Sequence, residues 1–183
     1  MTLLARADES LLLLIDLQDR LLGAINPATR HALIHQASVL AQAAKLLDIP
    51  VLHTEQHRQG LGPTTAALQP FLDIPTIDKT QFSCCGVSAV DAMLASAKRR
   101  CIVIAGVEAH ICVLQTALQL QAASHAVFVV EDAIASRNDA HKANALARLT
   151  QAGVIVSNVE STLFEWLADA GHPAFKSISA LIR

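Results

Sequence analysis

The chain has 183 residues, of which 52% are hydrophobic and 16% are charged, and its formal net charge is -2. This composition is typical of one compact domain, which we place at residues 1–183, and it excludes a disordered or fibrous chain. The sequence has five Phe, one Trp and no Tyr, and it contains no basic stripe. Because nucleic acids are bound by basic patches and stacking aromatic rings, we expect a small-molecule substrate and no nucleic acid.

Two features predict a cytoplasmic protein without a membrane partner. The apolar run at residues 11–15 is too short to span a bilayer or to form a secretory signal, and it ends at Asp16 without a small-residue cleavage site. The cysteines form neither a Cys-x-x-Cys pair nor the spacing of a disulfide framework, so we expect reduced thiols at Cys84, Cys85, Cys101 and Cys112.

Short aliphatic runs alternate along the chain with longer stretches of helical period, which is typical of crossover units on a parallel sheet. In chain order, we expect strands at residues 11–16, 51–54, 76–78, 101–106, 127–131 and 154–158. We expect helices at residues 27–47, 88–97, 111–123, 139–152 and 162–167, with caps at Asn26, Ser88, Asn138 and Ser161. Segment 55–75 lacks periodicity and contains Gly and Pro, which predicts an irregular loop near the site. The predicted fold is a three-layer α/β/α sandwich with a Rossmann-like, mainly parallel six-stranded sheet of order 3-2-1-4-5-6.

Three reactive side chains lie at the ends of these strands. Asp16 ends the first strand, Lys79 follows the third, and Cys112 lies beyond the fourth at the expected start of a helix. Ligands of open parallel sheets bind outside the carboxyl ends of the strands near the switch point, so we expect the three side chains to meet there. A helix N-terminus and the Lys79 ammonium would stabilise a Cys112 thiolate, and Asp16 would accept and return its proton. The predicted chemistry is acyl transfer to water, with an oxyanion bound by backbone N–H groups of residues 106–112.

At these residues the chain resembles the isochorismatase-like cysteine hydrolases, which include nicotinamidases and N-carbamoylsarcosine amidohydrolases. The resemblance covers nearly the full length and is carried by segments 15–18 (IDLQ), 78–83 (DKTQFS), 106–113 (GVEAHICV) and 115–117 (QTA). Segments 53–56 (HTEQ), 60–64 (GLGPT) and 108–112 (EAHIC) are most similar to the branch of isochorismatase domain-containing proteins that lacks a settled substrate.

The resemblance implies roles for particular residues. Asp16 would be the general base, Lys79 its charged partner and Cys112 the nucleophile. A cis peptide bond between Val107 and Glu108 would turn the Glu108 N–H toward the oxyanion, beside that of Cys112. Homo-oligomers, dimers or larger, are common in the family.

The resemblance also has one departure. Nicotinamidases carry an Asp-x-His metal motif after the second strand, where this chain has Gln56, His57 and Arg58. A catalytic zinc or iron site needs about three protein ligands, so we expect no metal and no cofactor, and nicotinamide is a poor candidate substrate. True isochorismatases generally lack the nucleophilic cysteine, so Cys112 favours an amidase-like reaction on a small C–N bond through a thioester.

Other residues carry open alternatives. Gln18 and Phe82 follow Asp16 and Lys79 closely enough to touch a substrate, although ordinary loop packing also explains them. His110 either lines the substrate pocket or satisfies local backbone groups. The Glu108 side chain is a candidate for a structural ion pair with Arg137, and Arg137 is otherwise a candidate for binding an anionic substrate. Cys84 and Cys85 are expected to pack under the following helix without a catalytic role.

Two other function classes are weighed against the hydrolase. A binding or scaffold protein with a silent site would keep the fold but show no selective reactivity of Cys112. A dehydrogenase is rejected, because no Gly-x-Gly-x-x-Gly follows the first strand and phosphates could not approach the backbone closely there.

Overall fold

In the computed structural model, which describes residues 3–183, six strands form one parallel sheet in the order β3-β2-β1-β4-β5-β6. The strands are β1 (Ser10–Ile15), β2 (Val51–Gln56), β3 (Ile77–Lys79), β4 (Cys101–Val107), β5 (Ala126–Ala135) and β6 (Ile155–Ser157). Each neighbouring pair is parallel. The predicted strand order is therefore confirmed, and it places β1 and β4 side by side at the switch point.

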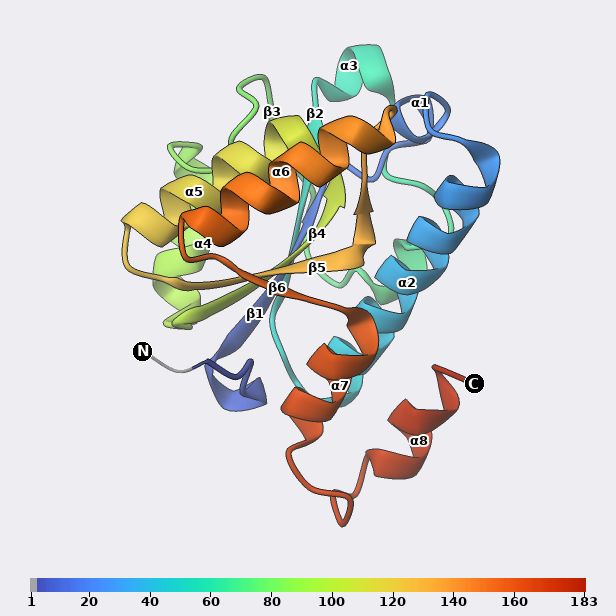
Figure 1. The fold of residues 1–183 in the computed structure, drawn as a ribbon, viewed down its shortest axis with the longest axis vertical. Helices are drawn as coiled ribbons and strands as arrows, with labels where there is room; N and C mark the ends of the chain where they lie inside the picture. Colours follow the sequence, from blue (N-terminus) through green and yellow to red (C-terminus); the bar gives the residue numbers. More distant parts are fainter. Residues whose placement is uncertain (1–2) are drawn as a thin grey trace.

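Helices cover both faces of the sheet (Figure 1). One layer contains α2 (Pro27–Leu46) and α7 (Val159–Leu167), and the other contains α4 (Ser88–Ala97), α5 (Leu114–Ala122) and α6 (Asp139–Gln151). Shorter elements are η1 (Ala7–Glu9), α1 (Asp19–Leu22), α3 (Arg58–Leu61), η2 (Gln69–Phe71), the π-helical turn η3 (Ala109–Val113) and α8 (Phe175–Ala180). The predicted three-layer sandwich is confirmed.

The alternation of side chains along β1 explains why the sheet has two cores. Leu12 and Leu14 pack into the core under α2 and α7, whereas Leu11, Leu13 and Ile15 pack into the core under α4, α5 and α6. Successive residues of a strand point to opposite faces, so a strand covered on both sides must be apolar throughout. This is why the run of leucines is continuous rather than alternating.

Several predicted boundaries were wrong. The fifth strand extends to Ala135 beyond the expected end at residue 131, and its register with β4 shifts between Ile104 and Gly106. The polar pair Glu131 and Asp132 suggested the end of the strand, although the chain continues through them. Segment 55–75 is not wholly irregular, because it begins within β2 and contains α3 and η2. These short elements are too brief to produce a readable period.

Two of the four predicted helix caps are confirmed. The side chains of Asn26 and Asn138 accept hydrogen bonds from the first turns of α2 and α6. Ser88 is instead the first residue of α4, which has no side-chain cap. The cap of α7 is Asn158, and Ser161 donates its backbone N–H to the Asn158 side chain.

Within residues 3–183, no helix is both long and apolar enough to cross a membrane. All four cysteines are free, as the sequence predicted.

Candidate active site

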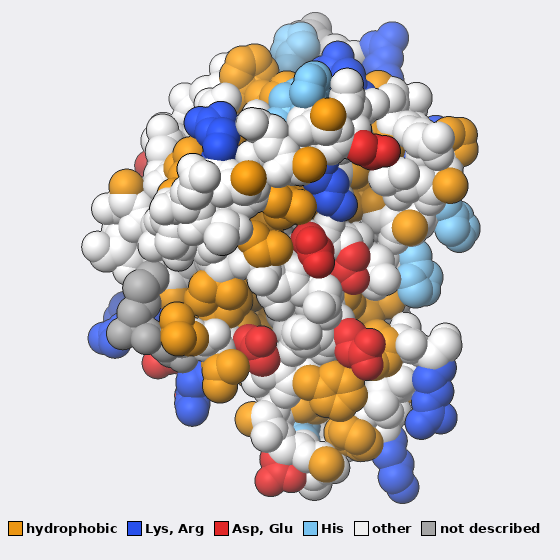
Figure 2. Space-filling view, viewed as in Figure 1, with side chains coloured by type: hydrophobic (Ala, Val, Ile, Leu, Met, Phe, Trp, Pro, Cys, Tyr) orange, Lys and Arg blue, Asp and Glu red, His pale blue; other side chains and the backbone are white. Residues whose placement is uncertain are grey.

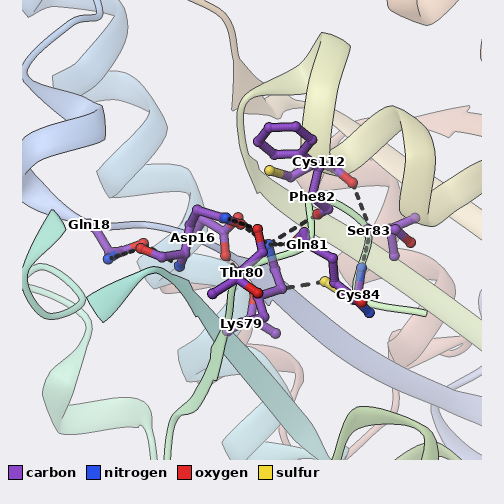
Figure 3. Close-up of polar contacts among 12 residues, drawn as sticks. Asp16, Gln18, Lys79, Thr80, Gln81, Phe82, Ser83, Cys84 and Cys112 are labelled. Carbon is purple, nitrogen blue, oxygen red and sulfur yellow. Dashed lines mark hydrogen bonds and ion pairs between the residues drawn. The ribbon is translucent and has the colours of Figure 1, made fainter. Parts of the chain in front are cut away.

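The topology brings the three predicted catalytic side chains to one edge of the sheet. Asp16 directly follows β1, Lys79 is the last residue of β3, and Cys112 lies in the turn η3 after β4. In Figure 3 these side chains converge from three different segments. All three residues are buried, with exposed fractions of 0%, 4% and 5% respectively.

Asp16 and Lys79 form a buried ion pair. The Lys79 Nζ donates to Asp16 Oδ2 at 2.7 Å, and neither side chain has any solvent-exposed surface. The same ammonium donates to Gln56 Oε1 at 2.7 Å and to the carbonyls of Phe82 at 3.0 Å and Gln81 at 3.3 Å. A buried ion pair is favourable only when its remaining hydrogen-bonding capacity is satisfied, and these acceptors satisfy that condition.

The other oxygen of Asp16 is also occupied. Thr54 donates its hydroxyl to Asp16 Oδ1 at 2.8 Å, and its carbonyl accepts the Asp16 backbone N–H at 3.1 Å. Asp16 has a left-handed backbone with φ 53°, so the chain turns sharply out of β1 at this residue. The carboxylate is therefore fixed by contacts from two neighbouring strands, β2 and β3.

The Cys112 thiol is protonated at neutral pH, which corrects the expectation of a stabilised thiolate. Burial raises its pKa to about 12, and the negative charge of the nearby Asp16 carboxylate adds to that rise. The Lys79 ammonium opposes the rise but does not overcome it. The sequence argument counted Lys79 as a free cation, whereas its charge is compensated by Asp16. Cys112 also lies inside the π-helical turn rather than at the start of α5.

The turn before Cys112 is held by Glu108. The peptide bond between Val107 and Glu108 is cis, and the Glu108 carbonyl accepts the backbone N–H groups of Ile111 and Val113. The Glu108 carboxylate accepts the Arg137 backbone N–H at 2.9 Å and the Arg137 Nη2 at 2.6 Å. Of the two alternatives for Arg137, the ion pair with Glu108 is therefore the one observed.

The residues predicted to touch a substrate occupy three different environments. Gln18 is fully buried, donating to the carbonyls of Gln56 and Gly62 and accepting the Gln56 N–H. The Gln18 amide thus fixes the backbone at Gln56 and Gly62. Phe82 is 54% exposed, and in Figure 3 its ring and the Cys112 sulfur point to the same side of the site.

His110 lies at the rim of the site, between η3 and α6. Its Nδ1 is 2.9 Å from Ser136 Oγ, and its ring centroid is 4.7 Å from that of His141. Burial lowers the pKa of His110, and the nearby His141 lowers it further while Glu108 opposes the shift. His110 is therefore neutral at pH 7, and its Nδ1 contacts a side-chain hydroxyl rather than the local backbone groups that one of its two alternatives named.

Sequence reasoning missed Thr54, Gln56 and Cys84 as parts of the site. Thr54 and Gln56 are two residues apart at the carboxyl end of β2 and both reach the ion pair. A signal for them was available, because alternate residues of a strand share a face and β2 is adjacent to β1. Cys84 was assigned only to packing, although its Sγ is 3.8 Å from Thr54 Oγ1.

The position that carries a metal motif in nicotinamidases has a different role here. Gln56 binds Lys79 through its amide oxygen and donates its Nε2 to the Thr80 carbonyl at 2.6 Å. Within residues 3–183, no group of three or more His, Cys, Asp or Glu side chains is arranged to hold a metal ion.

The sequence is similar to a known family over most of its length. The sequence profile of the Isochorismatase domain matches residues 10–161. The chain is 38% identical over 156 residues to the secreted isochorismatase effector Isc1 of Phytophthora sojae, covering 82% of this chain and 74% of that relative. It is 37% identical over 180 residues to isochorismatase domain-containing protein 2 of Homo sapiens, covering 95% of this chain and 83% of that relative.

Solved structures show the same fold. A Caenorhabditis elegans protein described as MAR1 ribonuclease has a TM-score of 0.91 and 34% identity, covering 97% of this chain and 91% of that one. The ycaC gene product of Escherichia coli, described as an octameric hydrolase of unknown specificity, also has a TM-score of 0.91. The match covers 100% of this chain and 90% of the Escherichia coli chain, but at 23% identity it is evidence for the fold alone.

Proposed function

Because the chain belongs to the isochorismatase family, whose fold is consistent with a hydrolase, we propose that it is a cysteine-dependent hydrolase. It cleaves an amide or related C–N bond of a small molecule through a thioester on Cys112. The observation that carries this proposal is the buried convergence of the Cys112 thiol with the Asp16 carboxylate, which accepts a hydrogen bond from the Lys79 ammonium at 2.7 Å. Such a carboxylate can act only as a proton acceptor until a proton reaches it.

In the acylation step, the Cys112 sulfur attacks the carbonyl carbon of the substrate as its proton passes to Asp16. A thiol with a raised pKa is a poor nucleophile unless a base removes its proton during attack, and Asp16 is that base. The tetrahedral intermediate then collapses, the C–N bond breaks, and Asp16 returns the proton to the leaving nitrogen. Lys79 keeps its contact with Asp16 throughout and limits the cost of moving charge in a buried site.

In the deacylation step, a water molecule attacks the thioester and gives a proton to Asp16. The carbon–sulfur bond then breaks, and Asp16 returns this proton to the Cys112 sulfur. The products are a carboxylic acid and an amine or ammonia, and the thiol is restored. One carboxylate therefore serves as base and acid in both halves of the reaction.

The oxyanion formed in each half is assigned to the backbone N–H groups of Glu108 and Cys112. Two contacts support this assignment, since the Glu108 carbonyl is turned into the η3 turn and its carboxylate is held by Arg137. One such donor typically contributes about 2.7–4 kcal/mol to lowering the barrier.

The substrate is proposed to be small and to include an apolar part. The exposed ring of Phe82 offers an apolar contact, and neutral His110 offers a hydrogen bond at the rim.

The protein is further proposed to be a homo-oligomer and to be located in the cytoplasm. The oligomer rests on the family to which the chain belongs, in which homo-oligomers are common. A location in the cytoplasm rests on the sequence pattern at residues 11–16, although the Phytophthora relative is described as secreted.

RNA is a second candidate substrate, because the nematode neighbour is described as a ribonuclease. The face drawn in Figure 2 mixes acidic, basic and hydrophobic side chains and has no continuous basic stripe. The formal net charge of -2 likewise gives little attraction for a polyanion. A small molecule therefore remains the favoured substrate, and RNA cleavage by wild type and Cys112→Ala protein checks the alternative.

The experiment that tests the proposal is peptide mapping after brief treatment with substoichiometric iodoacetamide at pH 7. We expect Cys112 to be labelled before Cys85, which is more exposed but whose thiol donates to the Thr116 carbonyl instead of lying beside Asp16. Asp16→Asn should remove this preference. A panel of amides, carbamoyl compounds and esters should then be turned over by wild type and not by Cys112→Ala. Labelling of Cys84 or Cys85 first, unchanged by Asp16→Asn, would contradict the proposal.

A further inference from the structure

The Asp16 carboxylate has a second supporting contact besides Lys79. Asp16 Oδ1 accepts the Thr54 hydroxyl at 2.8 Å, and Thr54 Oγ1 is 3.8 Å from the Cys84 Sγ. All three residues are fully or almost fully buried, so water does not compete for these contacts. Each of the three comes from a different part of the chain: the end of β1, the strand β2 and the segment before α4.

The direction of these hydrogen bonds follows from counting hydrogens. A threonine hydroxyl has one hydrogen, and an ionised carboxylate can only accept. The Thr54 hydrogen therefore belongs to the bond with Asp16 Oδ1. The remaining contact can form only if the Cys84 S–H donates to Thr54 Oγ1.

We propose that Thr54 and Cys84 are positioning residues that hold the Asp16 carboxylate in place through a directed relay from the Cys84 thiol to the Thr54 hydroxyl to Asp16 Oδ1. The inference deepens the proposed function and rests on it, because Asp16 is taken as the base for Cys112. It gives Cys84 a role that its packing alone does not require.

Further contacts fix Cys84 relative to the nucleophile. The Cys84 backbone N–H donates to Thr116 Oγ1 at 3.0 Å, and this hydroxyl donates to the Cys112 carbonyl at 2.7 Å. Through Thr116, the segment carrying Cys84 is thus hydrogen-bonded to the backbone of Cys112, the residue whose proton Asp16 is proposed to accept. A shift of Cys84 would move both the relay and the turn that carries Cys112.

Cys84 is also suited to be a permanent donor. Burial raises the pKa of its thiol to about 11, so it keeps its hydrogen across the neutral range. The ionisable groups that face Asp16 are Lys79 from β3, Cys112 from η3 and Cys84 itself. Both thiols therefore keep their hydrogens at neutral pH.

The test is the rate of Cys112 alkylation by iodoacetamide at pH 7, measured by peptide mass. Thr54→Val keeps the shape of the side chain but removes the hydroxyl that fixes Asp16, and it should lower this rate about tenfold. Thr54→Ser should keep the wild-type rate, and Cys84→Ala should lower the rate by less than Thr54→Val, because S–H is a weak donor.

Thr162→Val is the matched control, since Thr162 is equally buried but donates to Asn158 at the start of α7. Thermal melting of each variant shows that it is folded. An alkylation rate that is unchanged in Thr54→Val, or lowered equally in Thr54→Ser, would overturn the relay while leaving the proposed hydrolase intact. If wild-type protein shows no selective labelling of Cys112, the proposed function and the relay are both refuted. Failure of the relay alone is different, because Cys112 of the wild type is then still labelled selectively and only the variants behave unexpectedly.

Discussion

The Lys79 ammonium lies 2.7 Å from Asp16 Oδ2, and both side chains are completely shielded from solvent. Breaking such a pair leaves an uncompensated buried charge, so Lys79→Met should lower the free energy of unfolding by about 3–5 kcal/mol at pH 7. Replacing both partners, as Asp16→Asn with Lys79→Met, should cost less than the single change. Urea denaturation of the four proteins of this double-mutant cycle measures the difference.

Asp16→Asn should have opposite effects on the ionisation of the Cys112 thiol and on turnover. Burial is the main reason that the pKa of Cys112 is raised to about 12, and the Asp16 charge is the next. Removing that charge should lower the pKa of the thiol by roughly 1–3 units and speed alkylation above pH 9, while turnover falls roughly 10²–10⁴-fold. Alkylation rates from pH 7 to 11, followed by intact mass, check the first half. An unchanged profile would show that Asp16 does not contact the thiol.

The contact between Glu108 and Arg137 should give a measurable pH-dependent stabilisation. Burial favours the protonated form of Glu108, but hydrogen bonds from Arg137 outweigh burial and lower the pKa of the carboxyl group below its ordinary value of 4.5. A lowered pKa in the folded state stabilises the protein above pH 4.5, and this contribution is lost as pH falls through the lowered value. Because the Arg137 side chain is 58% exposed, Arg137→Ala should cost only about 1 kcal/mol or less.

Thermal melting of Arg137→Ala from pH 3 to 8 measures this effect. The difference from wild type should be present at pH 7 and vanish near pH 3. Arg148→Ala, on the exposed side of α6, is the control and should show no such pH dependence.

Gly106 should not tolerate a side chain. It has φ 128° and pairs with Ile15 in the sheet, and a Cβ there would lie 2.1 Å from the Ile15 carbonyl oxygen. Gly106→Ala should therefore cost about 3 kcal/mol or more, because it combines backbone strain with a clash next to Asp16. Gly62→Ala is the control, since Gly62 also has a positive φ but open space around its Cβ position, and it should cost about 1–2 kcal/mol. Equal melting temperatures for the two variants would contradict the steric argument.

The sequence by itself determined the architecture and the edge of the sheet at which Asp16, Lys79 and Cys112 meet. Continuous apolar runs such as residues 11–15 must be buried on both faces, and their alternation with helical segments favours a parallel sheet with crossover helices. Parallel strands end at one edge, so Asp16 and Lys79 had to lie at the same edge. The order of the strands was predicted by analogy with a Rossmann-like sheet.

Only the tertiary structure decided the protonation of the site and the groups that support it. In the sequence, the Lys79 charge seemed able to stabilise a Cys112 thiolate. In the fold, Lys79 forms an ion pair with Asp16, and burial is the main influence on the pKa of the Cys112 thiol. Thr54, Gln56 and Cys84 reach the site through contacts between strands and loops distant in sequence. Pattern and spacing report which face a residue occupies, whereas a pKa depends on the distance and solvent exposure of groups that meet only in the folded chain.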